Sequence, residues 1–144
     1  MGLHGNVSER AKWEVKERAD KAGEMVRRVA MLTGVERVMM TMYFEKGTSF
    51  RQIAELARLH ESTVSRRIDK ISRRLMDGRY GRCLRNREMF TNYELAIAKE
   101  YFVRGKSIRA LTEEKSTTYH RMRATVKRIE SVLELLKERK HSKL

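Results

Sequence analysis

SFRQIAELARLHESTVSRRIDK, residues 49–70, has the pattern of two helices joined by a tight turn. Ser49 is of a type that caps helix N-termini, and the run of apolar residues breaks near Arg58. We therefore expect a helix of about two turns, a short turn and a longer basic helix. The apolar residues of the first helix are expected to form its packing face: Phe50, Ile53, Ala54, Leu56 and Ala57.

The longer helix separates into two sides when its residues are placed at about 100° per residue. The apolar residues fall on one side, which predicts a core-facing stripe of Val64, Ile68, Ile71 and Leu75. The opposite side is polar and consists of Ser62, Arg66, Asp69 and Arg73. This wide polar side is either a solvated helix face or a surface that binds a ligand.

The same pattern occurs again 58 residues further along the chain. Ten of the 43 residues from 33 to 75 are identical to their counterparts at this offset, without a gap. Thr33 and Thr91 each begin a T-x-x-E capping box, which predicts helices that start near residues 34 and 92. Gly47 and Gly105 are expected to end these helices in a left-handed conformation.

Composition favours helices throughout the chain. Proline is absent from the 144 residues, 36% are charged, and runs of alternating β-branched residues are missing. We expect an all-α protein in which an N-terminal helix precedes two helix-turn-helix units of three helices each. The expected parts are the N-terminal helix at 1–32, the first unit at 33–75, a basic linker at 76–90, the second unit at 91–136 and a basic tail at 137–144.

Two of these parts have alternative interpretations. The apolar stripe of the N-terminal helix, from Ala11 to Val29, suits packing on the first unit or pairing with its counterpart in a homodimer. An extended linker is long enough to let both units bind neighbouring major-groove faces of one duplex. The alternative is that Arg79 to Met89 is partly helical and joins the repeats into one rigid body.

The net charge of +14 indicates a polyanionic partner, because lysine and arginine displace counterions from phosphates. Each repeat carries +4, so both are suited to phosphate. The sequence contains no apolar stretch of membrane-spanning length and no secretory leader, and we expect a soluble, cytoplasmic, nucleoid-associated protein without membrane contact. Cys83 is the single cysteine, and the four histidines are scattered, which predicts neither a disulfide nor a metal site. We expect no cofactor and no enzymatic activity, since no catalytic motif is found.

The segment IAELARLHESTVSRRI, Ile53 to Ile68, resembles the helix-turn-helix of the domain by which bacterial sigma factors recognise the upstream promoter element. The resemblance covers Val35 to about Leu75 strongly and the second repeat weakly. It implies a unit of three or four helices whose last helix enters the major groove. The residues that would then face base edges are Glu61, Ser62, Ser65 and Arg66. This sequence departs from the family at Arg58, where the family usually has a glycine, and it has no counterpart of the domains that melt promoter DNA.

The chemistry of these residues is consistent with DNA binding. Arg66 can donate two hydrogen bonds to the O6 and N7 atoms of guanine, and Ser62 can donate or accept. Other basic residues are better placed to bind phosphates, which fixes register without reading sequence. These predicted phosphate contacts are Arg51, Arg67, Lys70 and Arg74.

The second repeat keeps the core stripe but changes the outward face. Its stripe is Met122, Val126, Ile129 and Leu133. Ala124 replaces the arginine found at Arg66, and Glu114 replaces Leu56, which predicts looser packing of the short helix. This copy either reads bases or only binds phosphates or a protein. Its candidate contacts are Tyr119, His120, Arg121, Arg123 and Lys127.

Together these patterns predict a transcription regulator that binds double-stranded DNA sequence-specifically through tandem sigma-like helix-turn-helix units. One alternative is an adaptor that binds RNA polymerase or another protein and has only non-specific affinity for DNA. Another is a DNA-binding accessory of recombination, transposition or phage packaging.

Overall fold

The structure is a computed structural model that describes residues 22–142 and, as far as residue 137, their side chains. Every regular element in this part of the chain is a helix, so the all-α prediction is confirmed. The chain divides into two compact units, residues 1–72 and 73–144. Of the helix expected at 1–32, residues 22–29 are described and helical. Residues 30–32 are described but not helical, so this helix ends before the expected residue 32. Residues 1–21, with half of the stripe predicted for a dimer contact, lie outside the described residues.

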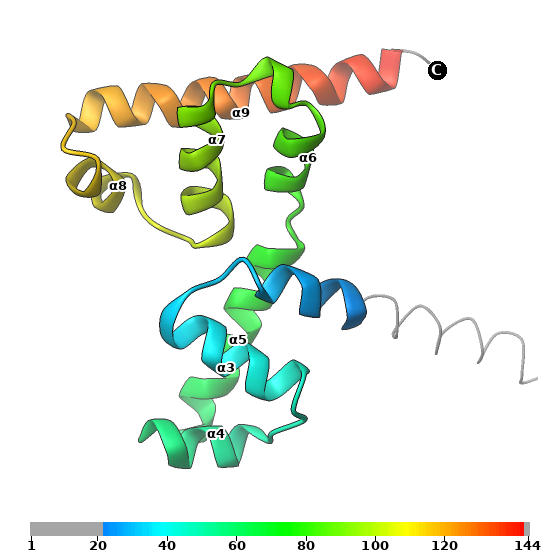
Figure 1. Cartoon of the computed structure of the whole chain (residues 1–144), viewed down its shortest axis with the longest axis vertical. Coiled ribbons are helices and arrows are strands. Elements are labelled where there is room, and N and C mark those ends of the chain that lie inside the picture. Colours follow the sequence, from blue (N-terminus) through cyan, green and yellow to red (C-terminus); the bar gives the residue numbers. More distant parts are fainter. Residues whose placement is uncertain (1–21, 143–144) are drawn as a thin grey trace, which may run out of the picture. The chain divides into compact units, whose positions relative to one another are not determined.

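The first unit contains three helices after the one at 22–29 (Figure 1): α3 (Gly34–Phe44), α4 (Phe50–Ala57) and α5 (Glu61–Met76). The last residues of α5, 73–76, fall in the second unit. The predicted stripe of α5 is confirmed, because its four apolar residues are at most 4% exposed. The buried residues of this core are Met25, Val29, Leu32, Met39, Met40, Ile53, Ala54, Val64, Ile68 and Ile71.

The second unit is built on the long helix α9 (Tyr119–Ser142). Ahead of it in the chain are α6 (Arg79–Arg85), the 3-10 helix η1 (Arg87–Met89), α7 (Asn92–Ala98), the π-helix η2 (Lys99–Val103) and α8 (Ile108–Glu114). In Figure 1, α6, α7 and α8 lie on one side of α9. Most of the basic tail expected at 137–144 is a continuation of α9.

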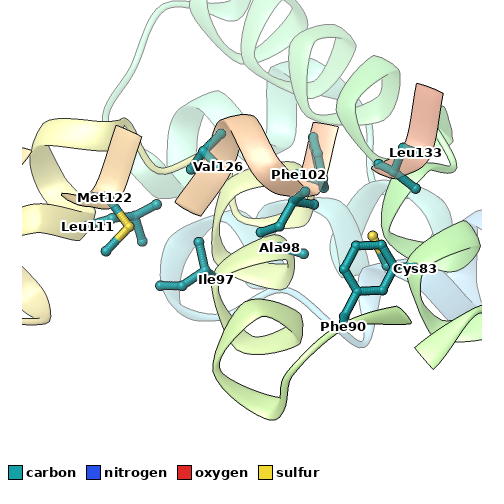
Figure 2. Packing of buried hydrophobic residues seen from close by; sticks show 10 residues of the cluster. Cys83, Phe90, Ile97, Ala98, Phe102, Leu111, Met122, Val126 and Leu133 are labelled. Atoms are coloured by element: carbon teal, nitrogen blue, oxygen red, sulfur yellow. The ribbon is translucent and has the colours of Figure 1, made fainter. Parts of the chain in front are cut away.

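Side chains from all four α-helices of this unit form one hydrophobic core (Figure 2). Leu111 and Met122 lie at one end of the core, and Cys83 and Phe90 lie at the other. The predicted stripe of α9 is confirmed, since each of its four apolar residues is buried. Burial of this stripe, at about 25 cal/mol per Å² of apolar surface, is what holds α9 against the shorter helices.

The backbone of the two units follows the 58-residue offset of the sequence. Gly47 and Gly105 adopt φ values of 67° and 68°, and Arg58 and Ser116 adopt φ values of 56° and 50°. All four lie in the left-handed region, at equivalent places in the two units. Equivalent backbone hydrogen bonds close these turns: Thr48 N to Met42 O (2.9 Å), Lys106 N to Glu100 O (3.1 Å), Leu59 N to Ala54 O (3.0 Å) and Thr117 N to Thr112 O (3.2 Å).

Core residues at equivalent positions often differ in size. Met40 in the first unit corresponds to Ala98 in the second, and Val64 corresponds to Met122; all four are buried. The two cores therefore share a pattern of burial and differ in how their volume is distributed among the helices.

The T-x-x-E capping box predicted for both units is formed at Thr91 in the second unit but not at Thr33 in the first. Thr91 Oγ1 accepts a hydrogen bond from the Glu94 amide at 3.0 Å, and Glu94 Oε1 accepts one from the Thr91 amide at 2.9 Å. Arg128 Nη1 lies 2.6 Å from Glu94 Oε2 and fixes this buried carboxylate over the cap. The prediction for Thr33 is wrong, because its side chain makes no capping hydrogen bond. Gly34 follows it with a φ of 62°, so the chain enters α3 through a left-handed residue.

Of the two alternatives for the segment 76–90, the helical form of 79–89 is confirmed and the extended linker is wrong. Residues 76–90 contain α6 and η1, and they bury Cys83 and Phe90 in the core of the second unit. These two residues stand 58 positions after Met25 and Leu32, which are buried in the first unit. Each unit thus has a helix ahead of the three predicted ones, and the internal repeat begins earlier than residue 33.

The predicted packing face of α4 is only partly correct. Ile53 and Ala54 are buried, but Leu56 is 72% exposed and Ala57 is exposed as well. The helical period places Leu56 outside the side of α4 that holds the buried pair. Because that position faces solvent, Glu114 at its equivalent in α8 does not loosen the packing of the second unit.

Candidate nucleic-acid interface

The start of α4 is fixed by a complete capping box. Ser49 Oγ accepts from the Gln52 amide at 3.1 Å, and Gln52 Oε1 accepts from the Ser49 amide at 3.1 Å. Both of these amides belong to the donors that a helix leaves unpaired at its N-terminus. The box therefore fixes where α4 begins, and with it the position of the turn that follows.

A turn of three residues, 58–60, connects α4 to α5. Arg58 takes the left-handed conformation with φ 56° and ψ 45°, and the Leu59 amide donates to the Ala54 carbonyl at 3.0 Å. The His60 carbonyl then accepts from the Val64 amide at 3.1 Å and begins the next helix. A non-glycine residue in this conformation costs about 1 kcal/mol, which the packing on either side of the turn must offset.

Most of the predicted contact residues of the first unit lie on its surface. Ser65 is half-buried, and six others are exposed: Arg51, Glu61, Ser62, Arg66, Arg67 and Lys70. Arg51 lies 3.6 Å from Glu55, and at this exposure such a pair contributes little. Within the residues that the structure describes, no hydrogen bond or ion pair engages the side chains of Arg66, Arg67 or Lys70. This side of α5 therefore presents three positive charges that an anionic ligand can neutralise.

Arg74 is placed differently from the other predicted phosphate contacts. Its side chain is half-buried, and its Nε donates to the Val103 carbonyl at 2.7 Å. The guanidinium also lies against Gly105, where an added Cβ would be 2.5 Å from Nη1. These contacts give Arg74 a structural role in the second unit, unlike the exposed cations of α5.

In the second unit the candidate residues occupy the first turns of α9. The Thr118 hydroxyl accepts from the Arg121 amide at 3.2 Å and caps the start of this helix. Tyr119 is 50% exposed, and the other four candidates are exposed as well: His120, Arg121, Arg123 and Lys127. Ala124 stands at the position of Arg66 and is exposed, so this surface lacks the central guanidinium found on α5.

Sequence reasoning overlooked the aromatic residues beside α5. The rings of Tyr43 and Phe50 are stacked, with centroids 4.7 Å apart and an angle of 16° between their planes. Both side chains are half-buried and line a cleft of about 440 Å³ that also includes Arg66. The available signal was the aromatic pair Tyr43 and Phe44, which recurs at Tyr101 and Phe102.

The described residues offer little for metal or thiol chemistry. Their histidine, cysteine and acidic side chains form no group of three or more that could hold a metal ion. Burial raises the pKa of the Cys83 thiol to about 11, although the charge of Arg82 acts in the opposite direction. A thiol that stays protonated at neutral pH is a poor nucleophile. None of the helices described here combines the length and apolar character that crossing a membrane requires.

The arrangement of α4, the turn and α5 exposes basic side chains that can contact an extended polyanion. The capping box of α4 and the three-residue turn position α5, which carries an exposed basic side with long side-chain donors. A comparison of the chain with protein-family models, curated proteins and solved structures finds no match.

Proposed function

We propose that this protein is a transcription regulator that binds double-stranded DNA sequence-specifically, with α5 of the first unit in the major groove. The observation that carries the proposal is the exposed side of α5, where Arg66, Arg67 and Lys70 have no partner among the described residues. A side of this kind gains free energy on binding phosphates, because its cations displace the counterions condensed on nucleic acid. The net charge of +14 extends the same preference to the whole chain.

Within this proposal Arg66 reads sequence. It is exposed near the N-terminal end of α5, the part of a recognition helix that reaches base edges. Its planar guanidinium matches the O6 and N7 acceptors of guanine, and neighbouring Ser62 can hydrogen-bond to any base edge. Arg67, Lys70 and Arg51 hold the two strands by their phosphates and so set the register of α5 in the groove.

In this proposal the second unit mainly adds affinity for DNA and does not read bases. Ala124 cannot replace the guanine contact of Arg66, while Arg121, Arg123 and Lys127 are exposed cations at the start of α9. Phosphate contacts of this kind add binding energy that falls steeply with salt. A regulator with one base-reading unit and one phosphate-binding unit acts on chromosomal DNA, which places it in the cytoplasm at the nucleoid.

Selection of bound duplexes from a random DNA pool tests the proposal. At about 150 mM salt, non-specific phosphate binding is already weakened, so enrichment of a motif requires contacts to bases. We expect one short motif that contains a guanine. A pool that shows no enrichment, together with binding that disappears with salt, would contradict sequence-specific reading.

Arg66→Ala, compared with Arg67→Ala, tests the role assigned to Arg66. Loss of a bidentate base contact lowers affinity for the selected site by about 1–3 kcal/mol and relaxes specificity at one base pair. Arg67→Ala removes the same charge from the same helix and is expected to weaken all sequences equally. Equal behaviour of the two variants on selected and unrelated duplexes would rule out base reading by Arg66.

A protein-binding adaptor is the second candidate function, and exposed apolar residues of the first unit favour it. Val35 and Val38 on α3 are 68% and 59% exposed, and Leu56 on α4 is 72% exposed. Exposed apolar groups that gather on one element often mark protein contacts. In this alternative the partner is RNA polymerase or another protein, and Val38→Asp abolishes its binding while leaving DNA affinity unchanged.

A further inference from the structure

A cleft of about 440 Å³ lies along one flank of α5 in the first unit. One wall consists of Tyr43 and Phe44 from the end of α3 and Phe50 from the start of α4. The other wall is α5 itself, which contributes Ser65, Arg66 and Asp69. The cleft thus combines an aromatic surface with polar groups of the helix that the proposed function places in the major groove.

The aromatic wall is a preformed stacking surface. Tyr43 stacks on Phe50 with the rings 4.7 Å apart, and Phe44 meets Tyr43 edge-on at 4.9 Å. All three side chains are half-buried rather than enclosed in the core, so part of their surface is open to the cleft. A further planar ring can extend this stack without reorganisation of the wall, which lowers the entropic cost of binding.

The second unit does not offer an equivalent surface. Ile108 stands at the position of Phe50, so the stacked pair cannot form there. Phe102 corresponds to Phe44, and the guanidinium of Arg79 lies over its ring, 4.6 Å from the centroid. Phe102 is also 5% exposed and belongs to the hydrophobic core. An open stack beside a basic helix is therefore specific to the unit that carries Arg66.

We propose that this cleft holds one unpaired nucleotide of the bound DNA, with its base on the stack of Tyr43 and Phe50 and its phosphate beside the Nε–H of Arg66, whose two Nη groups remain for the guanine. A nucleotide has the two groups that this cleft can bind: a planar base for the aromatic wall and an adjacent phosphate for the guanidinium. Because Arg66 borders both the cleft and the outward side of α5, a strand lying along α5 brings its nucleotides close to the stack. This inference rests on the proposed function, since it assumes that DNA lies against α5.

The test compares a fully paired duplex with the same duplex carrying one unpaired thymine, placed in turn at each position of the bound region. Labelled duplexes report affinity by fluorescence anisotropy at a fixed salt concentration. We expect one position at which the unpaired base raises the affinity of the wild-type protein about tenfold, as base stacking on an aromatic side chain does. If no position is preferred over the paired duplex, the inference is overturned.

Two sets of variants assign the preference to the cleft. Phe50→Ile installs the residue that the second unit has at this position, and Tyr43→Leu removes the other ring of the stack. Both are expected to abolish the tenfold preference while binding the paired duplex as the wild type does. Tyr43→Phe keeps the ring and is expected to keep the preference. A preference that survives Tyr43→Leu overturns the inference even if Phe50→Ile fails to fold.

Photocrosslinking separates this inference from the proposed function. 5-Iododeoxyuridine at the preferred unpaired position is expected to crosslink to Tyr43 or Phe50, as mapped by mass spectrometry. A crosslink to another part of the chain overturns the cleft assignment and leaves duplex binding intact. Binding of the unpaired form without any binding of paired DNA supports the cleft and overturns the proposed function. Failure to bind either form overturns both.

Discussion

The two units close the same glycine turn with different side chains. In the second unit, Lys106 Nζ lies 2.7 Å from the Glu100 carboxylate and 2.9 Å from the Glu114 carboxylate. The residues at the equivalent positions of the first unit are uncharged: Met42, Thr48 and Leu56. Both turns nevertheless form the same backbone hydrogen bond across six residues, at 2.9 Å in the first unit and 3.1 Å in the second.

This difference shows which interactions set the fold and which are free to vary. The left-handed glycine, the backbone bonds and the buried stripe recur, so they determine how the helices are connected. Many surface side chains differ, and the second unit has an ion-pair cluster where the first has the uncharged residues Met42, Thr48 and Leu56. The function of each unit therefore has to be derived from its own surface.

Among these substitutions, replacement of the two turn glycines is expected to lower the free energy of unfolding the most. Gly105→Ala places a Cβ at a φ of 68° and only 2.5 Å from Arg74 Nη1, so the Arg74 side chain must shift, which weakens its bond to the Val103 carbonyl. We expect a loss of about 2–3 kcal/mol in the free energy of unfolding of the second unit. Hydrogen exchange resolved by residue measures the two units separately.

Gly47→Ala is the matched control for this substitution. Its φ is 67°, but nothing lies within 4 Å of the added Cβ, so only the backbone term of about 1–2 kcal/mol applies to the first unit. Equal losses in the two units would show that the contact with Arg74 contributes nothing.

The next largest loss of stability is expected from the ion-pair cluster of the second unit, which consists of Lys106, Glu100 and Glu114. Lys106→Thr installs the residue of the first unit and leaves two carboxylates without their shared cation. We expect a loss of about 1–2 kcal/mol, less than for a fully buried pair, because the Lys106 side chain is 33% exposed. The triple variant Glu100→Met, Lys106→Thr, Glu114→Leu is expected to regain most of this stability, as measured by urea denaturation. A triple variant no more stable than Lys106→Thr would show that the apolar set does not fit the second turn.

The same cluster predicts that the stability of the second unit falls at acidic pH. Burial acts to raise the pKa of the Glu100 carboxyl, but the hydrogen bond from Lys106 and the charge of Arg104 outweigh it and lower the pKa below 4.5. A carboxyl with a lowered pKa in the folded state contributes stability at neutral pH, and this contribution is lost as the pH falls below 4.5. The triple variant is expected to lose less stability than the wild type between neutral pH and this acid range.

Alkaline pH is expected to affect the second unit through Cys83, whose counterpart in the first unit is Met25. Burial raises the pKa of the thiol from 9.0 to about 11, so the unfolded state ionises first and stability falls as the pH rises through this window. At pH 10 the loss amounts to about 1.4 kcal/mol. The difference in unfolding free energy between wild type and Cys83→Ala, measured against pH, isolates this contribution. If this difference in unfolding free energy stays constant from about pH 8 to about pH 10, the contribution of the Cys83 thiol is contradicted.

Ala124→Arg is expected to have the smallest effect and bears on DNA binding. It places a guanidinium on α9 at the position that Arg66 occupies on α5. We expect a gain of about 1 kcal/mol and a new preference for guanine next to the existing motif, seen by repeating the selection from random duplexes. Ala124→Lys adds the charge without the bidentate geometry, so its gain should be independent of sequence.

Much of this fold could be predicted from sequence because its signals are periodic. The stripes of α5 and α9, the left-handed glycines and the starts of α3 and α7 all follow from residue spacing. The helix in the supposed linker was also detectable, since Gly23 and Gly81, like Arg27 and Arg85, are identical at the 58-residue offset. That match begins before residue 33 and favours the helical alternative for residues 79–89.

The remaining features depend on contacts between distant residues. Arg74 looks like an exposed cation in the helical period, but its bond to the Val103 carbonyl, 29 positions away in sequence, gives it a structural role. The aromatic cleft needs α3, α4 and α5 to pack before its walls exist. Spacing within one helix predicts exposure well, as it did for Arg66 and Lys70, but not the partner that an exposed residue meets.

The unequal core residues have a consequence for folding. Adjacent repeats with similar backbones are prone to exchange helices as the chain collapses, and such exchange is a common cause of misassembly. Here an exchanged final helix would bring Val64 to a site shaped for Met122, or Met122 to one shaped for Val64. The first leaves a void and the second overfills the core, and each costs about 1–3 kcal/mol. Differences of this kind let a duplicated chain sort its own helices into the correct unit.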